Sequence, residues 1–552
     1  MKDLKPMLFS SLKGYKGKDL INDIIAGVIV AIIALPLSIA LALASGVGPE
    51  EGLYTAIIAG FLISFFGGSK VQIAGPTAAF ATIVAGIVAT NGMEGLIIAT
   101  VMAGIILILM GIFKLGSLIK FIPFTITTGF TAGIAVTILV GQLKDFFGLT
   151  YGEGVAPIET IEKIEAVVHH FHTVNLWAVL VGLLALAILI FWPKIPYLNK
   201  IPGSLVAVLA GIGLVAGFDL QVNTIGDLYS VSSALPKFHL PSFNIGLVKA
   251  VLPDAFTIAI LAAIESLLSC VVADGMTNSK HRSNAELVAQ GIGNLGSALF
   301  GGIPATGAIA RTAANIKSGG KSPIAGMVHA VVLLLILVLL MPYAALIPMP
   351  VIAAILFHVA YNMCQWRPFL HLLKTAPKSD IIVLVVTFLL TVIFDLVVAI
   401  VVGIVLACVL FMKRMSEETD IRSWKYSEEE WDDTASLRPV PKGVRIYEIS
   451  GPLFFGAADR IAEISTRGGT RCLVLRMRSV SAIDATAMNA LEALYARCKK
   501  KDIYIVFSHV NAQPMRTMKK AGFIKTVGKE HFLPHIDDAL KRATEIVESE
   551  QK

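Results

Sequence analysis

The sequence predicts an α-helical polytopic membrane protein that carries a small soluble α/β domain at its C-terminal end. Of its 552 residues, 55% are hydrophobic and only 15% are charged, whereas a soluble domain carries roughly 25% charged residues. Long apolar runs fill residues 21–412, and residues 415–552 return to ordinary polar patterning. This composition excludes a disordered, collagen-like or coiled-coil protein, since each of these needs a polar, glycine-periodic or heptad sequence.

Fourteen apolar segments are candidates for membrane spans, because a span needs about 20 apolar residues and broken spans are shorter. We expect a cytoplasmic tail at 1–20, a transmembrane domain at 21–413, a linker at 414–437 and a soluble domain at 438–552. The candidate spans are residues 21–44, 53–67, 72–90, 96–113, 121–141, 175–192, 203–218, 250–273, 285–300, 305–317, 324–341, 349–364, 380–394 and 396–412.

The charges between the spans predict the orientation of the chain. With the N-terminus inside, alternate loops carry basic residues such as Lys70 and Lys114, and the intervening loops carry acidic residues such as Glu94 and Glu159. This pattern obeys the positive-inside rule. We therefore expect a multi-pass protein of the inner cell membrane with both termini in the cytoplasm. The net charge of +7 is then explained by the orientation of the chain in the lipid bilayer, and no nucleic-acid partner is expected.

The chain carries no motif of a metal or cofactor site. Its five cysteines are scattered without metal-binding or disulfide spacing, and the polar tail has no P-loop. We expect no metal, no cofactor and no enzymatic activity.

An internal repeat relates the two halves of the transmembrane domain. The tripeptide Phe-Gly-Gly at 66–68 precedes a Gly/Pro-interrupted segment at 71–79, and the same tripeptide at 300–302 precedes a second such segment at 303–311. Seven spans precede a boundary near residue 240 and seven follow it, so the halves, about 21–218 and 250–413, must be inverted relative to each other. Paired broken segments in two inverted halves predict the binding site of a transporter.

The two broken segments have the features of an anion site. Pro and Gly interrupt a helix and leave backbone groups without hydrogen bonds, which lipid cannot supply. Two half-helix N-termini that face each other favour a negative charge between them. Arg311 would add a full positive charge. The alternative is that both segments are kinked packing helices with Gly for close approach. The candidate ligands are Thr77, Ala78, Ala308, Ile309, Ala310 and Arg311.

Glu265 is the second charged residue of interest, because it lies in the middle of the apolar span 250–273. A charge at the bilayer centre costs about 2.5–3.5 kcal/mol on insertion scales. Removal from water favours the protonated form of a carboxyl group, which suits a residue that carries a proton. The alternatives are a neutral structural glutamate or a glutamate paired with Arg311.

Several stretches resemble the sulfate permease (SulP) family of anion transporters, and the resemblance covers essentially the whole chain. It implies a uracil-permease-like fold with core and gate domains, an elevator-like movement and a homodimer. It also implies sulfate, bicarbonate or a C4-dicarboxylate as substrate, with a proton favoured over sodium as the coupling ion. The stretches are LPLSIALA at 35–42, GLYT at 52–55, AGPTA at 74–78, AIESLL at 263–268, VADGMT at 272–277 and ELVAQG at 286–291.

The resemblance also implies roles for individual residues. The family's anion pocket maps onto Leu37 and Leu41 in the first span, and onto the candidate ligands of the two broken segments. The family's acidic position in the eighth span maps onto Glu265, the expected proton-coupling residue.

The tail has the pattern of a small α/β fold. Strands are expected at 444–449, 472–477 and 503–507, and helices at 484–500, 511–521 and 535–549. The tail resembles the STAS domain of the same family, which implies a cytoplasmic protein partner. Asp484 is a good helix N-cap. In soluble anti-sigma-factor antagonists a phosphorylated Ser follows this Asp, whereas this chain has Ala485, so Thr486 is the remaining candidate for a regulatory position.

Three functions follow from these observations. The leading one is a secondary active anion transporter, coupled to protons or exchanging one anion for another. The second is a nucleobase permease of the same fold, which Arg311 disfavours because an uncharged ligand gains little from its field. The third is a membrane-anchored scaffold whose tail recruits signalling partners.

Overall fold

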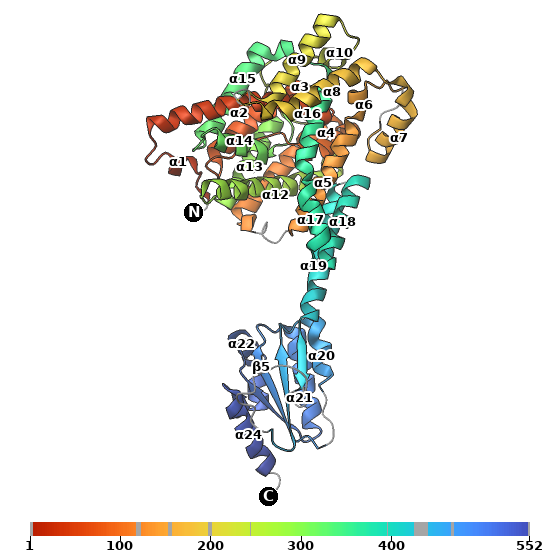
Figure 1. Cartoon of the computed structure of the whole chain (residues 1–552). Helices are drawn as coiled ribbons and strands as arrows, with labels where there is room; N and C mark the ends of the chain where they lie inside the picture. The colour runs from red at the N-terminus through yellow and green to blue at the C-terminus, as the bar shows by residue number, and fades with distance from the viewer. Residues whose placement is uncertain are drawn as a thin grey trace. The chain divides into compact units, whose positions relative to one another are not determined.

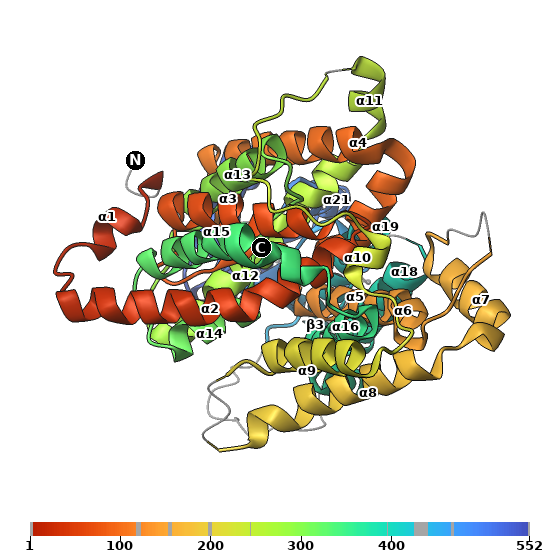
Figure 2. The same ribbon diagram turned by 90° about the horizontal axis from the view of Figure 1, so that it is seen from above.

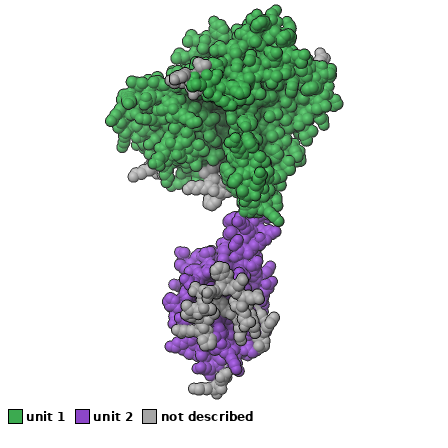
Figure 3. All heavy atoms as spheres, viewed as in Figure 1, with its two compact units in different colours: residues 1–404 green, residues 405–552 purple. Residues whose placement is uncertain are grey.

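The computed structural model describes residues 4–117, 123–152, 157–196, 201–242, 244–394, 396–423, 440–464 and 469–549. It divides into two compact units, residues 1–404 and 405–552, which Figure 3 shows in different colours. The first unit is helical apart from one short pair of strands, and the second contains an α/β sheet. Each unit has its own core, so each is described by itself.

Helices account for nearly all the regular structure of the first unit (Figure 1). Eight helical stretches in the described residues are long and apolar enough to cross a membrane. The helices are α1 (Leu8–Ser11), α2 (Gly17–Ala44), α3 (Pro49–Phe66), α4 (Ala78–Ile112), α5 (Phe124–Gly141), α6 (Leu143–Phe147), α7 (Thr160–His170), α8 (Leu176–Phe191), α9 (Gly203–Phe218), α10 (Ile225–Leu228), α11 (Ile245–Ala250), α12 (Leu252–Thr277), α13 (Ser283–Leu299), α14 (Ile309–Lys317), α15 (Ile324–Ala344), α16 (Met349–Cys364), α17 (Trp366–Thr375), α18 (Lys378–Ile393) and α19 (Leu396–Glu417).

Each of the fourteen expected segments overlaps one of these helices. The third and fourth segments both fall in α4, which consists of two helices joined across a kink at Gly92, where the backbone leaves helical geometry. The third and tenth segments each begin with a short strand before the helix starts. The count of fourteen spans stays a prediction, because several of these helices are shorter than a full span.

The helices of the first unit form two groups. Helices α2, α3, α4, α12, α13, α14 and α15 pack mainly on one another, and α5, α8, α9, α16 and α18 do the same (Figure 2). Close packing within the first group depends on glycine, since a Cβ on Gly291 would lie 2.5 Å from the carbonyl oxygen of Gly104 in the facing helix α4. Two such groups match the core and gate arrangement that the family resemblance implies.

The two broken segments meet inside the first group. Strand β1 (Ala74–Gly75) pairs antiparallel with β2 (Thr306–Gly307), with Ala74 opposite Gly307 and Gly75 opposite Thr306. The two segments that the sequence repeat relates, 71–79 and 303–311, are therefore brought side by side. Helices α4 and α14 start directly after these strands.

The second unit is a five-stranded sheet between two layers of helices. Its strand order is β3-β4-β5-β6-β7, and all neighbours are parallel except β3 and β4. Helix α24 covers one face with its own apolar core, while α20, α21, α22 and α23 cover the other. The elements are β3 (Asp420–Ser423), β4 (Val444–Ser450), α20 (Ala458–Ala462), β5 (Cys472–Ser479), α21 (Ala485–Lys499), β6 (Tyr504–Ser508), α22 (Ala512–Lys520), α23 (Phe523–Val527), β7 (Phe532–Leu533) and α24 (Ile536–Ser549).

Strand β3 lies in the stretch that was expected to be a linker, residues 414–437. It follows α19 after two residues and pairs with β4, with Asp420 opposite Ser450. A four-residue strand with two charged side chains has no clear alternation, which is why the hydropathy pattern does not reveal it. The rest of the expected linker, residues 424–437, lies outside the described residues.

Candidate functional site

The candidate site begins where the two strands turn into helices. Pro76 has no amide hydrogen, so β1 ends beside it, and α4 begins after Thr77, whose backbone is extended. On the other side Ala308 is the extended N-cap of α14, and its amide donates to the carbonyl oxygen of Ile73 at 2.8 Å. Both half-helices therefore start at the same level, just beyond the paired strands.

Buried polar side chains hold the two strands in place. Asn294 of α13 accepts from the amide of Ala305 and donates to its carbonyl oxygen, both at 2.9 Å. Ser266 of α12 accepts from the amide of Gly307 at 3.0 Å, and Thr312 of α14 accepts from the amide of Ile73 at 3.0 Å. These contacts satisfy extended backbone that lipid could not satisfy. The paired strands β1 and β2 thus form a hydrogen-bonded support for the two half-helices.

A second buried hydrogen-bond network holds the chain just before β1, at the end of this strand that is away from the start of α4. Glu286 of α13 is fully buried and accepts from the amide of Gly68 at 2.8 Å. It also accepts from the side-chain amides of Gln72 and Gln290, each at 2.9 Å. The carboxylate thus anchors the chain that leads into β1.

The helix starts leave backbone amides without intrahelical acceptors. In α4 these amides belong to Ala78 and Ala79, and in α14 they belong to Ile309 and Ala310. Ala310 is exposed, and Thr77 and Ile309 are partly exposed, so this end of the half-helices is open. The amide of Ala308 is already used by Ile73. The free donors and the helix dipoles together favour a negative group at this place.

Arg311 lies one turn into α14 and is only 2% exposed. Its Nη2 donates to the carbonyl oxygen of Pro76, while Nε and Nη1 have no hydrogen-bond partner in the structure. In the part of the chain that the structure describes, no carboxylate forms an ion pair with it. The guanidinium packs directly on the first strand, since a Cβ on Gly75 would lie 2.5 Å from Nη1.

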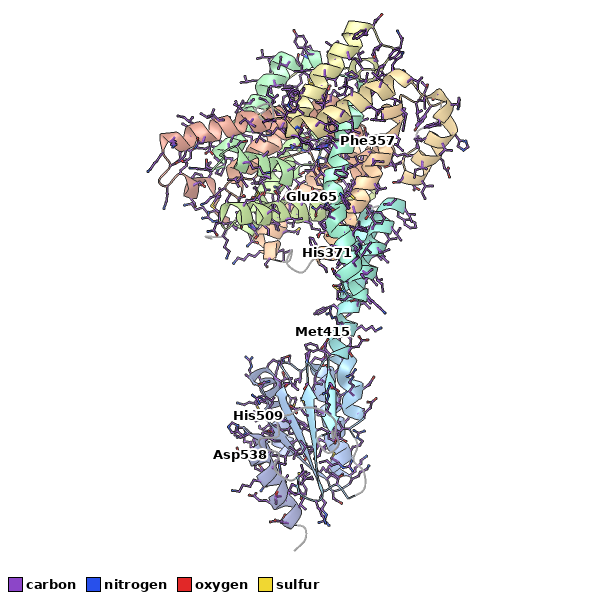
Figure 4. The ribbon with its side chains drawn as sticks, in the orientation of Figure 1. Glu265, Phe357, His371, Met415, His509 and Asp538 are labelled. Carbon is purple, nitrogen blue, oxygen red and sulfur yellow. The ribbon has the colours of Figure 1, made fainter. Side chains whose placement is uncertain are left out.

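Glu265 lies on α12, inside the helical unit (Figure 4). The hydroxyl of Thr77 donates to its Oε2 at 3.0 Å, which ties the carboxyl group to the start of α4. The side chain is partly exposed, and none of the ion pairs among the described residues includes it. The structure therefore brings Glu265 to the site without pairing it with Arg311.

The first-span residues of the expected pocket belong to α2, which packs against α14. Leu37 is partly exposed and Leu41 is 1% exposed. Of the two, Leu37 is the one with surface available to a ligand. Pro36 interrupts the hydrogen bonding of α2 immediately before it.

In the second unit, Asp484 caps helix α21. Its Oδ1 accepts from the amide of Ala487, and its Oδ2 accepts from the amide of Phe455, both at 2.8 Å. Ala485 and Thr486 follow it and are exposed. Asp484 thus joins the helix to the loop after β4, and Thr486 faces outward.

Sequence reasoning missed the polar residues that support the site. Ser266 and Thr312 lie directly next to Glu265 and Arg311 in the chain, and Gln72 and Asn294 lie within other apolar segments. The available signal was the rarity of such side chains in membrane helices, where they form interhelical hydrogen bonds. Among the described residues, no three His, Cys, Asp or Glu side chains come together as a metal site.

Comparison with known proteins follows the same division of the chain. The model of the sulfate permease family matches residues 20–387, and the model of the STAS domain matches residues 437–539. The putative sulfate transporter YvdB of Bacillus subtilis is 41% identical over 96% of this chain and 99% of its own length. The bicarbonate transporter BicA of Picosynechococcus is 32% identical over 95% of this chain and 94% of its own length.

The fold also has a solved counterpart. The inward-facing structure of the murine anion transporter Slc26a9 superposes with a TM-score of 0.87 over 98% of this chain and 94% of that one. The sequences are 19% identical, so this likeness shows a common fold alone.

Proposed function

The chain belongs to the sulfate permease family, and from that premise we propose that it is a secondary active transporter of a small anion. The candidate substrates are sulfate, bicarbonate and a C4-dicarboxylate. Two relatives carry names that support the first two, a putative sulfate transporter and a bicarbonate transporter. The substrate site is the space in front of the half-helices α4 and α14.

The observation that carries this proposal is the uncompensated charge of Arg311. A charge taken out of water costs several kcal/mol unless a partner or hydrogen bonds offset the loss. Among the described residues, Arg311 has one neutral acceptor, the Pro76 carbonyl oxygen, and two nitrogens without a partner. Two half-helix N-termini add further positive potential from the same side. An anion would satisfy all of these groups together, whereas an uncharged nucleobase would leave the charge unpaired.

The pocket that we assign to this anion combines the candidate ligands of the sequence. The amides of Ala78, Ile309 and Ala310 would bind oxygen atoms of the substrate, and the Thr77 hydroxyl would position it. Leu37 and Leu41 would form the apolar wall, and Ala308 would support the start of α14.

Glu265 is the proposed coupling residue. Its hydrogen bond with Thr77 places a titratable group at the mouth of the anion site, and no cation accompanies it among the described ion pairs. Proton uptake there would offset the charge of the incoming anion, so we assign coupling to a proton rather than to sodium. The two helix groups of the first unit support an elevator-like movement, in which the group that carries the site shifts against the other.

We place the protein in the inner cell membrane as a homodimer with cytoplasmic termini. The STAS domain then lies on the cytoplasmic side, where a protein partner could regulate transport. Every observation that fits a purely scaffolding role also fits a transporter, so none favours the scaffold.

The test is uptake into proteoliposomes of labelled sulfate, bicarbonate and succinate, with uracil as the uncharged control. One of the anions is expected to accumulate when the pH gradient is imposed, and uracil is not. Glu265→Gln should lose accumulation driven by the gradient but keep anion binding, measured as a thermal shift. Arg311→Gln should lose both. Uptake of uracil alone, or anion uptake that neither substitution changes, would overturn the proposal.

A further inference from the structure

The soluble unit exposes very few large apolar side chains. In residues 440–464 and 469–549, which the structure describes, the exposed large apolar side chains are three: Phe454 at 38%, Phe455 at 58% and Tyr504 at 45%. Two of the three are adjacent in sequence and carry no polar atom on the side chain. An exposed pair of phenylalanines on a polar domain indicates contact with something apolar.

Phe454 and Phe455 lie beside the end of the last apolar helix, α19. Together with Pro452 they face Phe411, Met412 and Met415 across a cavity of about 250 Å³. Figure 4 marks Met415 near the end of this helix. Phe411 and Met412 are themselves 62% and 42% exposed, so the cavity continues into an apolar outer surface of α19.

The loop that carries the two phenylalanines is fixed to the helix end by polar contacts. The Ser416 hydroxyl donates to the carbonyl oxygen of Gly456, and the Thr419 hydroxyl donates to that of Pro452 at 2.8 Å. The Phe455 amide donates to Asp484, the cap of α21, at 2.8 Å. These bonds hold the phenylalanines at the level of residues 411–415 rather than leaving them on a free loop.

The charged residues at the end of α19 indicate where residues 411–415 lie relative to the membrane. The helix is apolar up to Met412, and Lys413 and Arg414 follow at once. Basic residues directly after a span mark its cytoplasmic end, where they meet anionic headgroups. The cavity lies at the last apolar turn, so it is at the boundary between acyl chains and headgroups.

We propose that this cavity binds an acyl chain of a cytoplasmic-leaflet phospholipid, with Phe454 and Phe455 inserted at the membrane boundary. Arg414 would hold the lipid's phosphate, together with Lys413 once Lys413 leaves Glu417, whose carboxylate lies 3.8 Å from its Nζ. The STAS domain would then be attached to the membrane surface as well as to α19. This inference rests on the orientation given under the proposed function and not on which anion is carried.

The test uses the full chain in nanodiscs of phosphatidylethanolamine and phosphatidylglycerol, with the photoreactive residue p-benzoylphenylalanine at one position. Phe455→p-benzoylphenylalanine is the probe. Tyr504→p-benzoylphenylalanine is the matched control, since Tyr504 is the other exposed aromatic and lines a separate cavity. After illumination, mass spectrometry of the intact protein is expected to find a phospholipid adduct for position 455 at least fivefold more often than for position 504.

Three results would overturn the proposal: equal lipid adducts at both positions, a cross-link from 455 to a second copy of the chain, or a cross-link from 455 to residues 1–404. Phe454→p-benzoylphenylalanine repeats the measurement at the neighbouring side chain. It replaces the first probe if that variant elutes as an aggregate. An absence of lipid adducts at both 454 and 455 would also overturn the inference, whatever the transport assays find.

Discussion

The guanidinium of Arg311 combines burial with an incomplete set of partners. Its Nη2 donates to the carbonyl oxygen of Pro76, so the second half of the repeat contacts the first through this residue. The contact is possible because residue 75 is glycine.

We therefore predict that Gly75→Ala impairs transport by moving Arg311. The new Cβ would lie 2.5 Å from Nη1, so the guanidinium must shift, and the φ of +159° at residue 75 would be strained for a residue with a side chain. Anion uptake is expected to fall at least tenfold, which corresponds to about 1.4 kcal/mol of lost interaction. The control is Gly86→Ala in α4, the half-helix that follows this strand, where a Cβ meets nothing within 4 Å. Equal uptake by the two variants would contradict the proposed role of this contact.

From the surroundings of His531 we predict that the second unit loses stability in acid. Burial lowers the pKa of its imidazole below the ordinary 6.5; Glu530, 3.8 Å away, opposes this shift, and Arg542 adds to it. Its Nδ1 is buried and has no hydrogen-bond partner within the described part of this unit. The unfolded chain thus takes up this proton at higher pH than the folded domain. The stability that the neutral ring contributes is present above pH 6.5 and is lost as the pH falls below 6.5.

The measurement is hydrogen exchange of β7 and α24 in the full chain between pH 7.5 and 5, corrected for intrinsic exchange rates. Protection of these elements should decrease toward the acid end in the natural sequence, and His531→Gln should make the profile flatter. An identical slope in both proteins would exclude His531 as the cause.

At the scale of the element, the side chain that caps α21 accepts hydrogen bonds both from the helix and from the loop before it. Asp484 accepts from Ala487 inside the helix and from Phe455 in the preceding loop. We predict that Asp484→Ala destabilises α21 by about 1 kcal/mol, the usual effect of losing an N-cap. Amide exchange in residues 485–490 should become about fivefold faster, whereas Thr486→Ala, at an exposed neighbour, should leave it unchanged. A larger effect of Thr486→Ala would point to a structural role for that residue.

The elements differ in how far the sequence predicts them. The interruptions at Gly75-Pro76 and at Pro304 to Gly307 are visible because Gly and Pro act on their own backbone. The support from Glu286 to Gln72 joins residues 214 positions apart, and no local pattern reports such a contact. The same holds for the bond from Arg311 to Pro76. The sequence thus predicts where the two segments are interrupted but not which side chains hold them in place.

For the whole molecule, the internal repeat explains how the two helix groups are built, because each half of the repeat contributes helices to both groups. The strands β1 and β2 join the two halves within the group that carries the site, and the other group contributes helices from both halves as well. Each half therefore supplies part of both groups. An anion site made of one broken helix from each half can keep its geometry only if those two helices move together, and the shared polar supports provide that coupling.

The division into two units leads to the last prediction. All the candidate anion ligands lie in residues 1–404, which have their own packed interior. A chain that ends at Glu417 loses β3 together with the rest of the sheet, so no strand edge is left unpaired. We expect its anion Kd, from thermal shifts, to stay within about twofold of the full chain, a difference near 0.4 kcal/mol. Uptake in proteoliposomes should persist as well. Loss of binding would place part of the anion site's support in the STAS domain, and loss of uptake with intact binding would make that domain a necessary part of the moving machinery.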